Sequence, residues 1–373
     1  MDQLHPPATI AMNSFQSEPT SLKLAMQSAV NRVIESGWYV LGNEGIEFER
    51  VWAARCGLKH AIGVGNGMDA IEIILRSLGI GEGDEVITTP MTAFATVLAI
   101  LRSGAIPVLA DIDKSTGHIS LESAQRCFTN KTKAIIYVHL YGQICPMDLW
   151  IEFCNQNNVQ LIEDCAQAHL ASLNGKVAGS YGVAGAYSFY PTKNLGALGD
   201  GGMIVTDDHL IDTLSRQLRN YGQSARYHHP HIGMNSRLDE MQAAILIERN
   251  KWLDQFTERR RDIAEEYMNS FNNRRIKLLA PPSERSSHVY HLYVILSDET
   301  ERLSQHLAQR HIQSLIHYPV PTHLQESCKD IRRDPDGLIN AEEYSQTCLS
   351  IPCHPQMQEN DVSRVIKAIN EFE

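Results

Sequence analysis

The sequence predicts an α/β protein in which a large domain with a mostly parallel central sheet precedes a smaller α+β domain. Short apolar segments alternate with helical segments from residue 60 to residue 164. At 373 residues the chain is also long for a single hydrophobic core. The composition then changes beyond residue 275, where two prolines precede another apolar segment. We therefore expect an N-terminal arm at 1–20, a large domain at 21–250 and a small domain at 251–373.

Hydrophobic spacing and turn residues predict the individual elements. The expected helices are 21–36, 46–56, 70–78, 92–102, 121–127, 147–157, 210–219, 241–254, 258–271, 301–310 and one from 359 onward. The expected strands are 61–65, 84–89, 106–110, 132–139, 159–162 and 289–295, with one on each side of residue 193. Alternating strands and helices favour parallel pairing with right-handed crossovers. Ligands bind such sheets at the carboxyl ends of the strands, where Asp164 and the turns after Gly65 and Thr89 lie.

Charge and composition exclude several function classes. The net charge is −11 and the pI is near 5.8, which argues against a nucleic-acid or anionic-membrane partner. The N-terminus has no secretory-signal pattern, and no apolar run approaches the roughly 18 residues of a membrane span. Eight cysteines are scattered without a Cys-x-x-Cys motif, a pattern typical of reduced thiols. The sequence therefore predicts a cytoplasmic protein.

Lys193 lies among small residues, in the segment Ser188-Phe189-Tyr190-Pro191-Thr192-Lys193-Asn194 that precedes a glycine-rich turn. Most lysines in such loops are solvated surface residues. In a tight turn between buried strands, however, burial lowers the pKa of the amine and makes it a nucleophile. A lysine that forms a Schiff base needs this environment.

Asp164 ends a buried strand 29 residues before this lysine. A carboxylate there needs a partner, because burying an unpaired charge is costly. One interpretation is a helix cap or a structural ion pair. The other is that Asp164 keeps the pyridine nitrogen of pyridoxal phosphate protonated, while Lys193 forms the Schiff base.

A phosphate site for such a cofactor is predicted in the turn from Gly65 to Asp69. Backbone N–H groups at the start of the following helix suit an anion. Ser188 would add a hydroxyl group, and Phe94 would stack on a flat ring unless it belongs to the core. The histidines of His228-His229-Pro230-His231 lack the spacing and the acidic partner of a metal site, so we expect no bound metal.

Taken in order, these segments resemble the sugar-nucleotide aminotransferases of the DegT/DnrJ/StrS family over about residues 25–370. The matching segments are 65–70, 83–87, 92–96, 163–169, 188–194, 233–237 and 317–319. The resemblance implies the aspartate aminotransferase type of fold (fold type I), the cofactor pyridoxal 5′-phosphate and a homodimer with shared active sites. Members of the family that lack the lysine carry out dehydration, so the retained Lys193 favours transamination.

The resemblance also implies roles for individual residues. Lys193 would be the Schiff-base lysine and proton shuttle, and Asp164 would pair with the pyridine nitrogen. The other implied cofactor contacts are Gly67, Met68, Phe94, Gln167, Ser188 and, from the neighbouring subunit, Asn235. Two positions depart from the family pattern. Met68 replaces a frequent threonine, which leaves only a backbone contact there, and Cys165 replaces a more usual alanine.

The segments 139–143 and 317–323 look like those of members that aminate C3 of a dTDP-3-keto-6-deoxyhexose with L-glutamate as amino donor. Such amino sugars serve O-antigen, S-layer or antibiotic glycan biosynthesis. The residues expected to contact the substrate are Tyr190, Arg219, Tyr221, His317 and Tyr318. Two alternatives stay open: a 4-keto or UDP-linked 3-keto sugar as substrate, and a catalytically silent binding or regulatory protein on the same fold.

Overall fold

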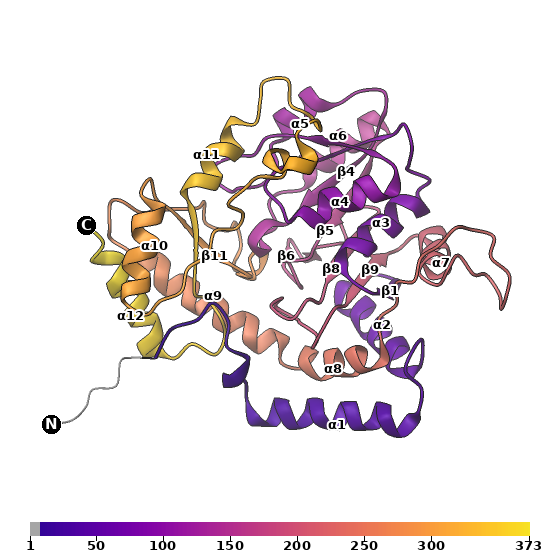
Figure 1. Ribbon diagram of the computed structural model, residues 1–373, viewed down its shortest axis with the longest axis horizontal. Coiled ribbons are helices and arrows are strands. Elements are labelled where there is room, and N and C mark those ends of the chain that lie inside the picture. Colours follow the sequence, from indigo (N-terminus) through magenta and orange to yellow (C-terminus); the bar gives the residue numbers. More distant parts are fainter. Residues whose placement is uncertain (1–7) are drawn as a thin grey trace.

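The computed structural model describes residues 8–373 and shows a helix-flanked sheet with a smaller layered unit beside it (Figure 1). Eight strands form the large sheet in the order β1-β9-β8-β5-β4-β2-β3-β12. They are β1 (His60–Val64), β2 (Glu85–Thr88), β3 (Ile106–Leu109), β4 (Thr132–Val138), β5 (Gln160–Asp164), β8 (Ala184–Ser188), β9 (Gly202–Thr206) and β12 (Arg332–Arg333). The predicted α/β class and mostly parallel sheet are confirmed.

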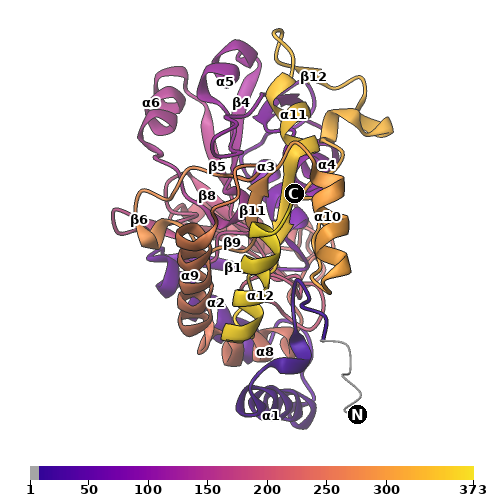
Figure 2. The same cartoon turned by 90° about the vertical axis from the view of Figure 1, so that its left-hand side faces the viewer.

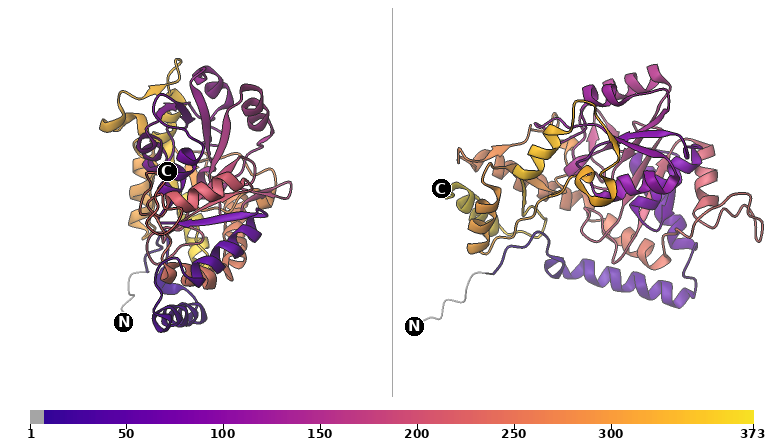
Figure 3. Two further views of the ribbon diagram at one scale, coloured as in Figure 1. Left: turned by 90° about the vertical axis from the view of Figure 1, so that its right-hand side faces the viewer. Right: turned by 45° about the horizontal axis from the view of Figure 1, so that its top comes forward.

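Helices cover both faces of this sheet because the buried strands are apolar on both sides. The helices are α1 (Thr20–Ser36), α2 (Asn43–Cys56), α3 (Gly67–Ser77), α4 (Phe94–Ser103), α5 (Leu121–Cys127), α6 (Asp148–Asn157), α7 (His209–Leu218) and α8 (Glu240–Asn250). One apolar core includes residues of α2, α5 and α6, and the other includes residues of α3, α4 and α7. Helix α1 lies along the edge of the molecule and packs on α8 (Figures 1 and 3).

The smaller unit contains a three-stranded sheet of β10 (Lys277–Leu278), β11 (Tyr293–Leu296) and β13 (Cys348–Ile351). Its helices are α9 (Leu253–Ser270), α10 (Thr300–Gln309) and α12 (Glu359–Asn370), and α12 packs between the other two (Figure 2). Helix α11 (Ile339–Thr347) and β12 bring the chain back to the large sheet, where β12 pairs with β3. The predicted domain boundary at residue 250 falls between α8 and α9 and stays a prediction.

The N-terminal arm contacts the smaller unit. Residues 1–7 of the predicted arm lie outside the described residues. Beyond them, the backbone N–H of Ile10 donates to the carbonyl of His311 at 2.8 Å, and the Ile10 side chain is buried. Farther along, Glu18 forms a buried ion pair with Arg249 of α8 at 2.6 Å. The arm therefore joins both parts of the molecule.

The structure adds the direction of one strand, which the sequence did not predict, and shortens one predicted strand. Strand β9 pairs antiparallel with both β1 and β8, because a loop and not a helix joins it to β8. The strand expected at 289–295 begins only at Tyr293. Ahead of it, the N–H of Val289 donates to the Gly142 carbonyl at 2.9 Å, and the Val289 carbonyl accepts from the Asn194 side chain at 2.9 Å. These bonds join the smaller unit to the lysine loop and divert residues 289–292 from the sheet.

A buried carboxylate on β5 fixes the turn at residues 179–182 that precedes β8. Oε1 of Glu163 accepts the backbone N–H groups of Tyr181 and Gly182 at 2.7 and 2.8 Å. Oε2 accepts the Gly179 N–H at 2.8 Å and lies 2.7 Å from Nε2 of His139. Side chains of a strand alternate between faces, so the next residue, Asp164, points to the opposite side of the sheet. One carboxylate is thereby structural, and its neighbour is free to serve a site.

Replacing Glu163 with glutamine should destabilise the protein by about 3 kcal/mol, because an NH₂ group would face backbone N–H donors in a dry interior. This corresponds to a fall in Tm of roughly 4 °C. Thermal scans at one protein concentration would measure it. The exposed Glu152→Gln is the matched control and should lie within about 0.5 kcal/mol of the parent. Equal Tm values for the two variants would contradict the structural role of Glu163.

No helix among residues 8–373 combines the length and the apolar character that a membrane crossing requires.

Candidate active site

Lys193 lies in the loop that joins β8 to β9, and the two strands bring both ends of this loop to one edge of the sheet. The backbone N–H of Lys193 donates to the Tyr190 carbonyl at 2.9 Å, which closes a tight turn. Gly196 permits the turn, because a Cβ there would lie 2.3 Å from the Pro191 carbonyl oxygen. Burial lowers the pKa of the Lys193 amine to about 8, although the nearby charge of Asp164 opposes the shift. The loop therefore presents a nucleophilic amine.

An anion-binding turn lies beside this loop, at the start of α3. The Asn66 side chain caps the helix by accepting the Asp69 N–H at 2.8 Å. The N–H groups of Gly67 and Met68 lie in the first turn, where no carbonyl of the helix can accept them. A Cβ at residue 67 would lie only 2.8 Å from the Cβ of Ser188. The missing side chain thus lets the Ser188 hydroxyl approach two free amides, a donor set that suits a phosphate.

Asp164 ends β5 and is 6% exposed. Its Oδ2 accepts the Thr96 hydroxyl at 2.8 Å, and its Oδ1 accepts the Ala166 N–H at 3.1 Å. Among residues 8–373 no lysine, arginine or histidine forms an ion pair with this carboxylate. A buried carboxylate without an ion-pair partner in the chain favours a cationic group on a bound ligand.

Gln167 links the turn after β5 to a loop of the smaller unit. Its Oε1 accepts the Tyr141 N–H at 2.6 Å, and its Nε2 donates to the Tyr318 hydroxyl at 3.0 Å. The Tyr141 hydroxyl in turn donates to the His317 carbonyl at 2.6 Å. Burial and the charge of Asp164 raise the pKa of the Tyr318 phenol, so the phenol stays protonated. These bonds fix the position of the Gln167 amide.

Three histidines surround the lysine, and all are neutral at pH 7. Burial, reinforced by the charge of Lys193, lowers the pKa of His169 to about 3 and that of His317 to about 4, and lowers the pKa of His291 well below its usual value. Nε2 of His169 donates to the Ser188 carbonyl at 2.9 Å, and His291 lies 3.2 Å from the Asn194 side chain. The histidines therefore add hydrogen-bonding groups but no positive charge near Asp164.

The residues fit pyridoxal 5′-phosphate. The start of α3 and Ser188 provide a phosphate cradle that a side chain at residue 67 would fill. Asp164 provides a buried anion without a cationic partner in the described chain, which matches a protonated pyridine nitrogen. Phe94, the first residue of α4, packs in the same apolar cluster as Tyr318. The amine of Lys193 completes the set.

The pKa of Lys193 predicts how cofactor capture depends on pH. Only the neutral amine attacks an aldehyde, and its fraction rises until the pH passes the pKa, about 8. We expect the rate at which apoenzyme takes up pyridoxal phosphate to have its midpoint near pH 8. Rapid-mixing absorbance over a pH series would measure it. A rate still climbing about tenfold per pH unit toward pH 10, as for an ordinary lysine, would contradict the depressed pKa.

Some of the predicted substrate residues lie beside Lys193, and others lie at the protein surface. His317 and Tyr318 lie next to the lysine and Gln167. Tyr190, in the lysine loop, is 53% exposed. Tyr221 is also exposed, and the Arg237 guanidinium lies over its ring. Asn235 is also exposed, where it pairs with Asn220.

The structure does not support a substrate contact by Arg219. Its guanidinium is buried and donates to Glu49 at 2.5 Å and to the Gly63 carbonyl at 2.7 Å. These bonds hold α7 against α2 and β1, so Arg219 has a structural role. The expectation arose from its position beside a polar loop, and sequence alone does not reveal that Glu49, 170 residues earlier, occupies the guanidinium.

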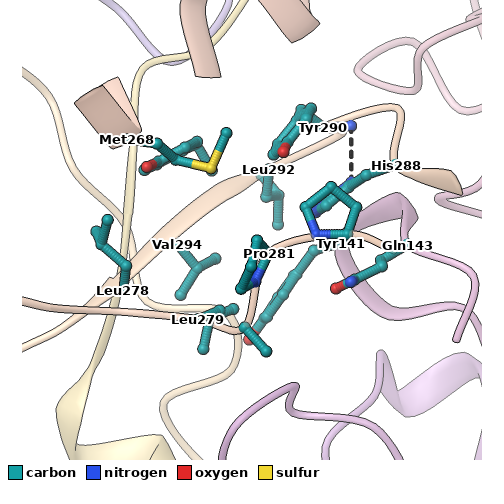
Figure 4. Close-up of a pocket in the computed structure, with 13 residues that line it drawn as sticks. Tyr141, Gln143, Met268, Leu278, Leu279, Pro281, His288, Tyr290, Leu292 and Val294 are labelled. Carbon is teal, nitrogen blue, oxygen red and sulfur yellow. Dashed lines mark hydrogen bonds between the residues drawn. The ribbon is translucent and has the colours of Figure 1, made fainter. Parts of the chain in front are cut away.

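A small cavity between the two parts of the molecule is not the substrate site. Tyr141 and Gln143 line it on one side, and Leu279, Pro281 and other residues of the smaller unit line the other (Figure 4). Its volume of about 30 Å³ holds a few water molecules at most.

Several residues that support the site were not predicted from the sequence. Thr96 bonds Asp164, the backbone of Tyr141 bonds Gln167, and His169 and His291 surround the lysine. Thr96 and His169 lie within segments 92–96 and 163–169, which resemble the family, and this resemblance could have indicated them. Their roles depend on contacts across 68 and 19 residues of chain, which spacing does not predict.

Comparisons with known proteins agree with this geometry. The model of the DegT/DnrJ/EryC1/StrS aminotransferase family matches residues 21–370. The dTDP-3-amino-3,6-dideoxy-alpha-D-galactopyranose transaminase of Aneurinibacillus thermoaerophilus is 44% identical over 93% of this chain and 95% of its own. A pleiotropic regulatory protein of Geobacillus stearothermophilus is 40% identical over 97% of this chain and 98% of its own. S. venezuelae DesV, solved in complex with a ketimine intermediate, superposes with a TM-score of 0.94 at 37% identity, covering 98% of this chain and 99% of DesV.

Proposed function

Since the chain belongs to the DegT/DnrJ/EryC1/StrS aminotransferase family and is a pyridoxal-phosphate enzyme, we propose a specific reaction for it. It aminates C3 of a dTDP-linked 3-keto-6-deoxyhexose, with L-glutamate as the amino donor. The observation that carries the proposal is the nucleophilic Lys193 facing the unpaired Asp164 beside a phosphate cradle. The 44% sequence identity with a dTDP-3-amino sugar transaminase, over 95% of that protein's length, supports the choice of substrate.

When bound, pyridoxal phosphate supplies an electron sink for the carbon that loses or gains a proton. The cradle of Gly67, Met68 and Ser188 would hold its phosphate. Asp164 would keep the proton on the ring nitrogen, and Phe94 and Gln167 would orient the ring. Hydrogen bonds within the chain already position Asp164 and Gln167, which reduces the ordering cost of binding at these two residues.

Lys193 would carry both proton transfers. As a neutral amine it would accept the proton from Cα of glutamate, and as an ammonium it would later protonate C3 of the sugar. A group with a pKa of about 8 exchanges protons in both directions near neutral pH. The neutral His317 and the protonated Tyr318 phenol would contact the sugar without adding charge. Tyr190 and Tyr221, which are exposed at the surface, would complete the substrate contacts.

A homodimer with shared active sites belongs to the same proposal. Several large apolar side chains are exposed near the lysine loop and α2, a surface that a second copy would cover. They are Trp38, Ile46 and Leu198, with exposures of 64, 62 and 57%. Asn235 would reach the phosphate of the partner's site. A cytoplasmic location is also part of the proposal and accords with eight free cysteines.

Hybrid dimers test the shared site. Lys193→Ala and Asn235→Ala should each be strongly impaired alone, but mixed subunits would form one intact site per hybrid dimer. After unfolding and refolding in equal amounts, the mixture should regain about one quarter of the parent activity, because half of the dimers are hybrids. Each variant refolded alone is the control. Recovery no greater than the mean of the two controls would mean that Asn235 does not act across the interface.

A substrate panel tests the reaction. Glutamate-dependent amination would be measured by kcat/KM on dTDP- and UDP-linked 3-keto and 4-keto sugars. We expect the dTDP-linked 3-keto-6-deoxyhexose to exceed the others by at least about tenfold, which a difference of 1.4 kcal/mol in transition-state binding produces. A preference for a 4-keto or UDP-linked sugar would move the assignment to that alternative.

The alternative from another class is a catalytically silent binding or regulatory protein, and the G. stearothermophilus relative is named as a regulatory protein. The complete set of Lys193, Asp164 and the phosphate cradle argues against it here. Absence of amination on every sugar of the panel, with the cofactor fully bound, would favour this alternative.

A further inference from the structure

A cysteine and a histidine form a pair outside the cofactor site. Sγ of Cys145 lies 3.5 Å from Nδ1 of His118. His118 is 3% exposed, whereas Cys145 is partly exposed and is the only one of the eight cysteines that is not buried. The pair therefore combines a partly exposed cysteine with a base that is shielded from water.

A hydrogen bond on the far side of the ring fixes which nitrogen of His118 faces the thiol. Nε2 lies 3.1 Å from the carbonyl oxygen of Gln143. A carbonyl only accepts hydrogen bonds, so Nε2 carries the proton and the neutral ring presents the lone pair of Nδ1 to Cys145. Transfer of the thiol proton from Sγ to Nδ1 then gives a thiolate beside an imidazolium, the arrangement that activates cysteine nucleophiles.

The groups around the pair have opposing effects. Burial alone would raise the pKa of the Cys145 thiol, but the charge and hydrogen bond of His118 outweigh it and lower the pKa. Hydrogen bonding by the Tyr137 hydroxyl acts in the same direction, and Asp113 opposes it. Burial likewise disfavours the imidazolium of His118, yet Cys145 raises its pKa. His288, which also senses the charge of His118, has a pKa of about 3 and is neutral.

Six of the buried cysteines behave in the opposite way. Burial raises the pKa of five of them to about 12 and that of Cys165 well above its usual value. These five are Cys56, Cys127, Cys154, Cys348 and Cys353. Because the other seven cysteines are all buried, modification of the folded protein should be confined to Cys145.

We propose that Cys145 is a thiol-modification site, activated by His118, that reacts with soft electrophiles and with low-molecular-weight disulfides such as glutathione disulfide. The Cys145 thiolate attacks one sulfur of the disulfide, whose S–S bond breaks as the mixed disulfide forms, and a glutathione thiolate leaves. Cys145 is oxidised and one glutathione is reduced, so no other oxidant is needed. His118 retains the proton that the thiol released.

The site lies close in sequence to residues that contact the active site. Cys145 follows the loop in which the Tyr141 N–H holds Gln167 and the Ile144 N–H donates to the Ser287 carbonyl at 2.7 Å. Gln143, whose carbonyl fixes the His118 ring, also lines the small cavity between the two parts of the molecule (Figure 4).

Alkylation rates test the proposal. Folded holoenzyme would be treated with limiting iodoacetamide over a pH series, with N-acetylcysteine in the same tube, and labelling of each cysteine followed by peptide mass spectrometry. At about two pH units below its pKa a reference thiol is only about 1% thiolate. We expect Cys145 to label first, with a pH midpoint below that of the reference. His118→Gln should raise this midpoint, and glutathione disulfide should add one glutathionyl group per chain, which Cys145→Ser abolishes.

Two results would overturn the proposal. One is a midpoint for Cys145 in the parent protein equal to or above that of N-acetylcysteine. The other is labelling of Cys145 no faster than that of the buried cysteines. Both results are measured on the parent protein, so they can overturn the proposal even if His118→Gln fails to fold. The exposed His311→Gln is the matched control and should leave the midpoint unchanged.

Discussion

Replacing Lys193 with alanine is expected to lower kcat for glutamate-dependent amination by about 10⁴-fold, the largest effect of any single substitution in this protein. The variant loses both the covalent attachment of the cofactor and the group that moves the proton. The phosphate cradle at α3 and the Asp164 carboxylate are untouched, so the variant should fold and still bind pyridoxal phosphate noncovalently.

The two consequences are measured separately. Amino sugar formation gives kcat, and borohydride reduction followed by peptide mass spectrometry shows whether the cofactor is fixed to the peptide that contains residue 193. The exposed Lys131→Ala is the matched control and should retain parent activity and parent labelling. If Lys193→Ala keeps more than about 1% of parent kcat, another group moves the proton and the assignment is wrong.

Replacing Asp164 with asparagine should lower kcat by about 10³-fold, because the neutral amide cannot stabilise a protonated pyridine nitrogen. Asparagine keeps the shape, and its Oδ1 can still accept the Ala166 N–H and the Thr96 hydroxyl one at a time. The variant should therefore bind the cofactor and turn over slowly. Loss of charge has a second effect. Asp164 raises the pKa of Lys193 against burial, so that pKa should fall below its parent value of about 8.

Steady-state kinetics and the pH dependence of cofactor capture check both effects of Asp164→Asn. The comparison variant is Thr96→Val, which removes one hydrogen bond to the carboxylate but keeps its charge, and should cost about tenfold in kcat. An unchanged midpoint for cofactor capture together with parent-like kcat would contradict the role of Asp164. A larger loss in Thr96→Val than in Asp164→Asn would do the same.

The sequence predicts the large sheet and the placement of several site residues at strand and helix ends because both depend on local patterns. Apolar strand segments and helix periodicity gave β1 to β5 and the helices between them to within a few residues. The positions of Asp164 and Ser188 follow from strand ends, and that of Gly67 from the start of a helix. A parallel sheet brings such ends to one edge, so their meeting did not require knowledge of side-chain packing.

Features that depend on distant contacts were not predictable in this way. Helix α11 and the short strand β12 have little periodicity, and β12 exists because it pairs with β3 across more than 200 residues of chain. The antiparallel β9 follows from the absence of a helix in the lysine loop, which composition alone does not reveal. The structural role of Arg219 required Glu49 to be placed beside it in space.

Transfer of ¹⁵N from labelled glutamate tests the central claim most directly. Parent enzyme would be incubated with ¹⁵N-glutamate and the dTDP-linked 3-keto-6-deoxyhexose, and the product examined by NMR for coupling between nitrogen and the sugar carbons. The account predicts ¹⁵N bonded to C3 of the parent product and none in the product mixture of Lys193→Ala. Nitrogen at C4, or unlabelled sugar with fully loaded parent enzyme, would contradict it.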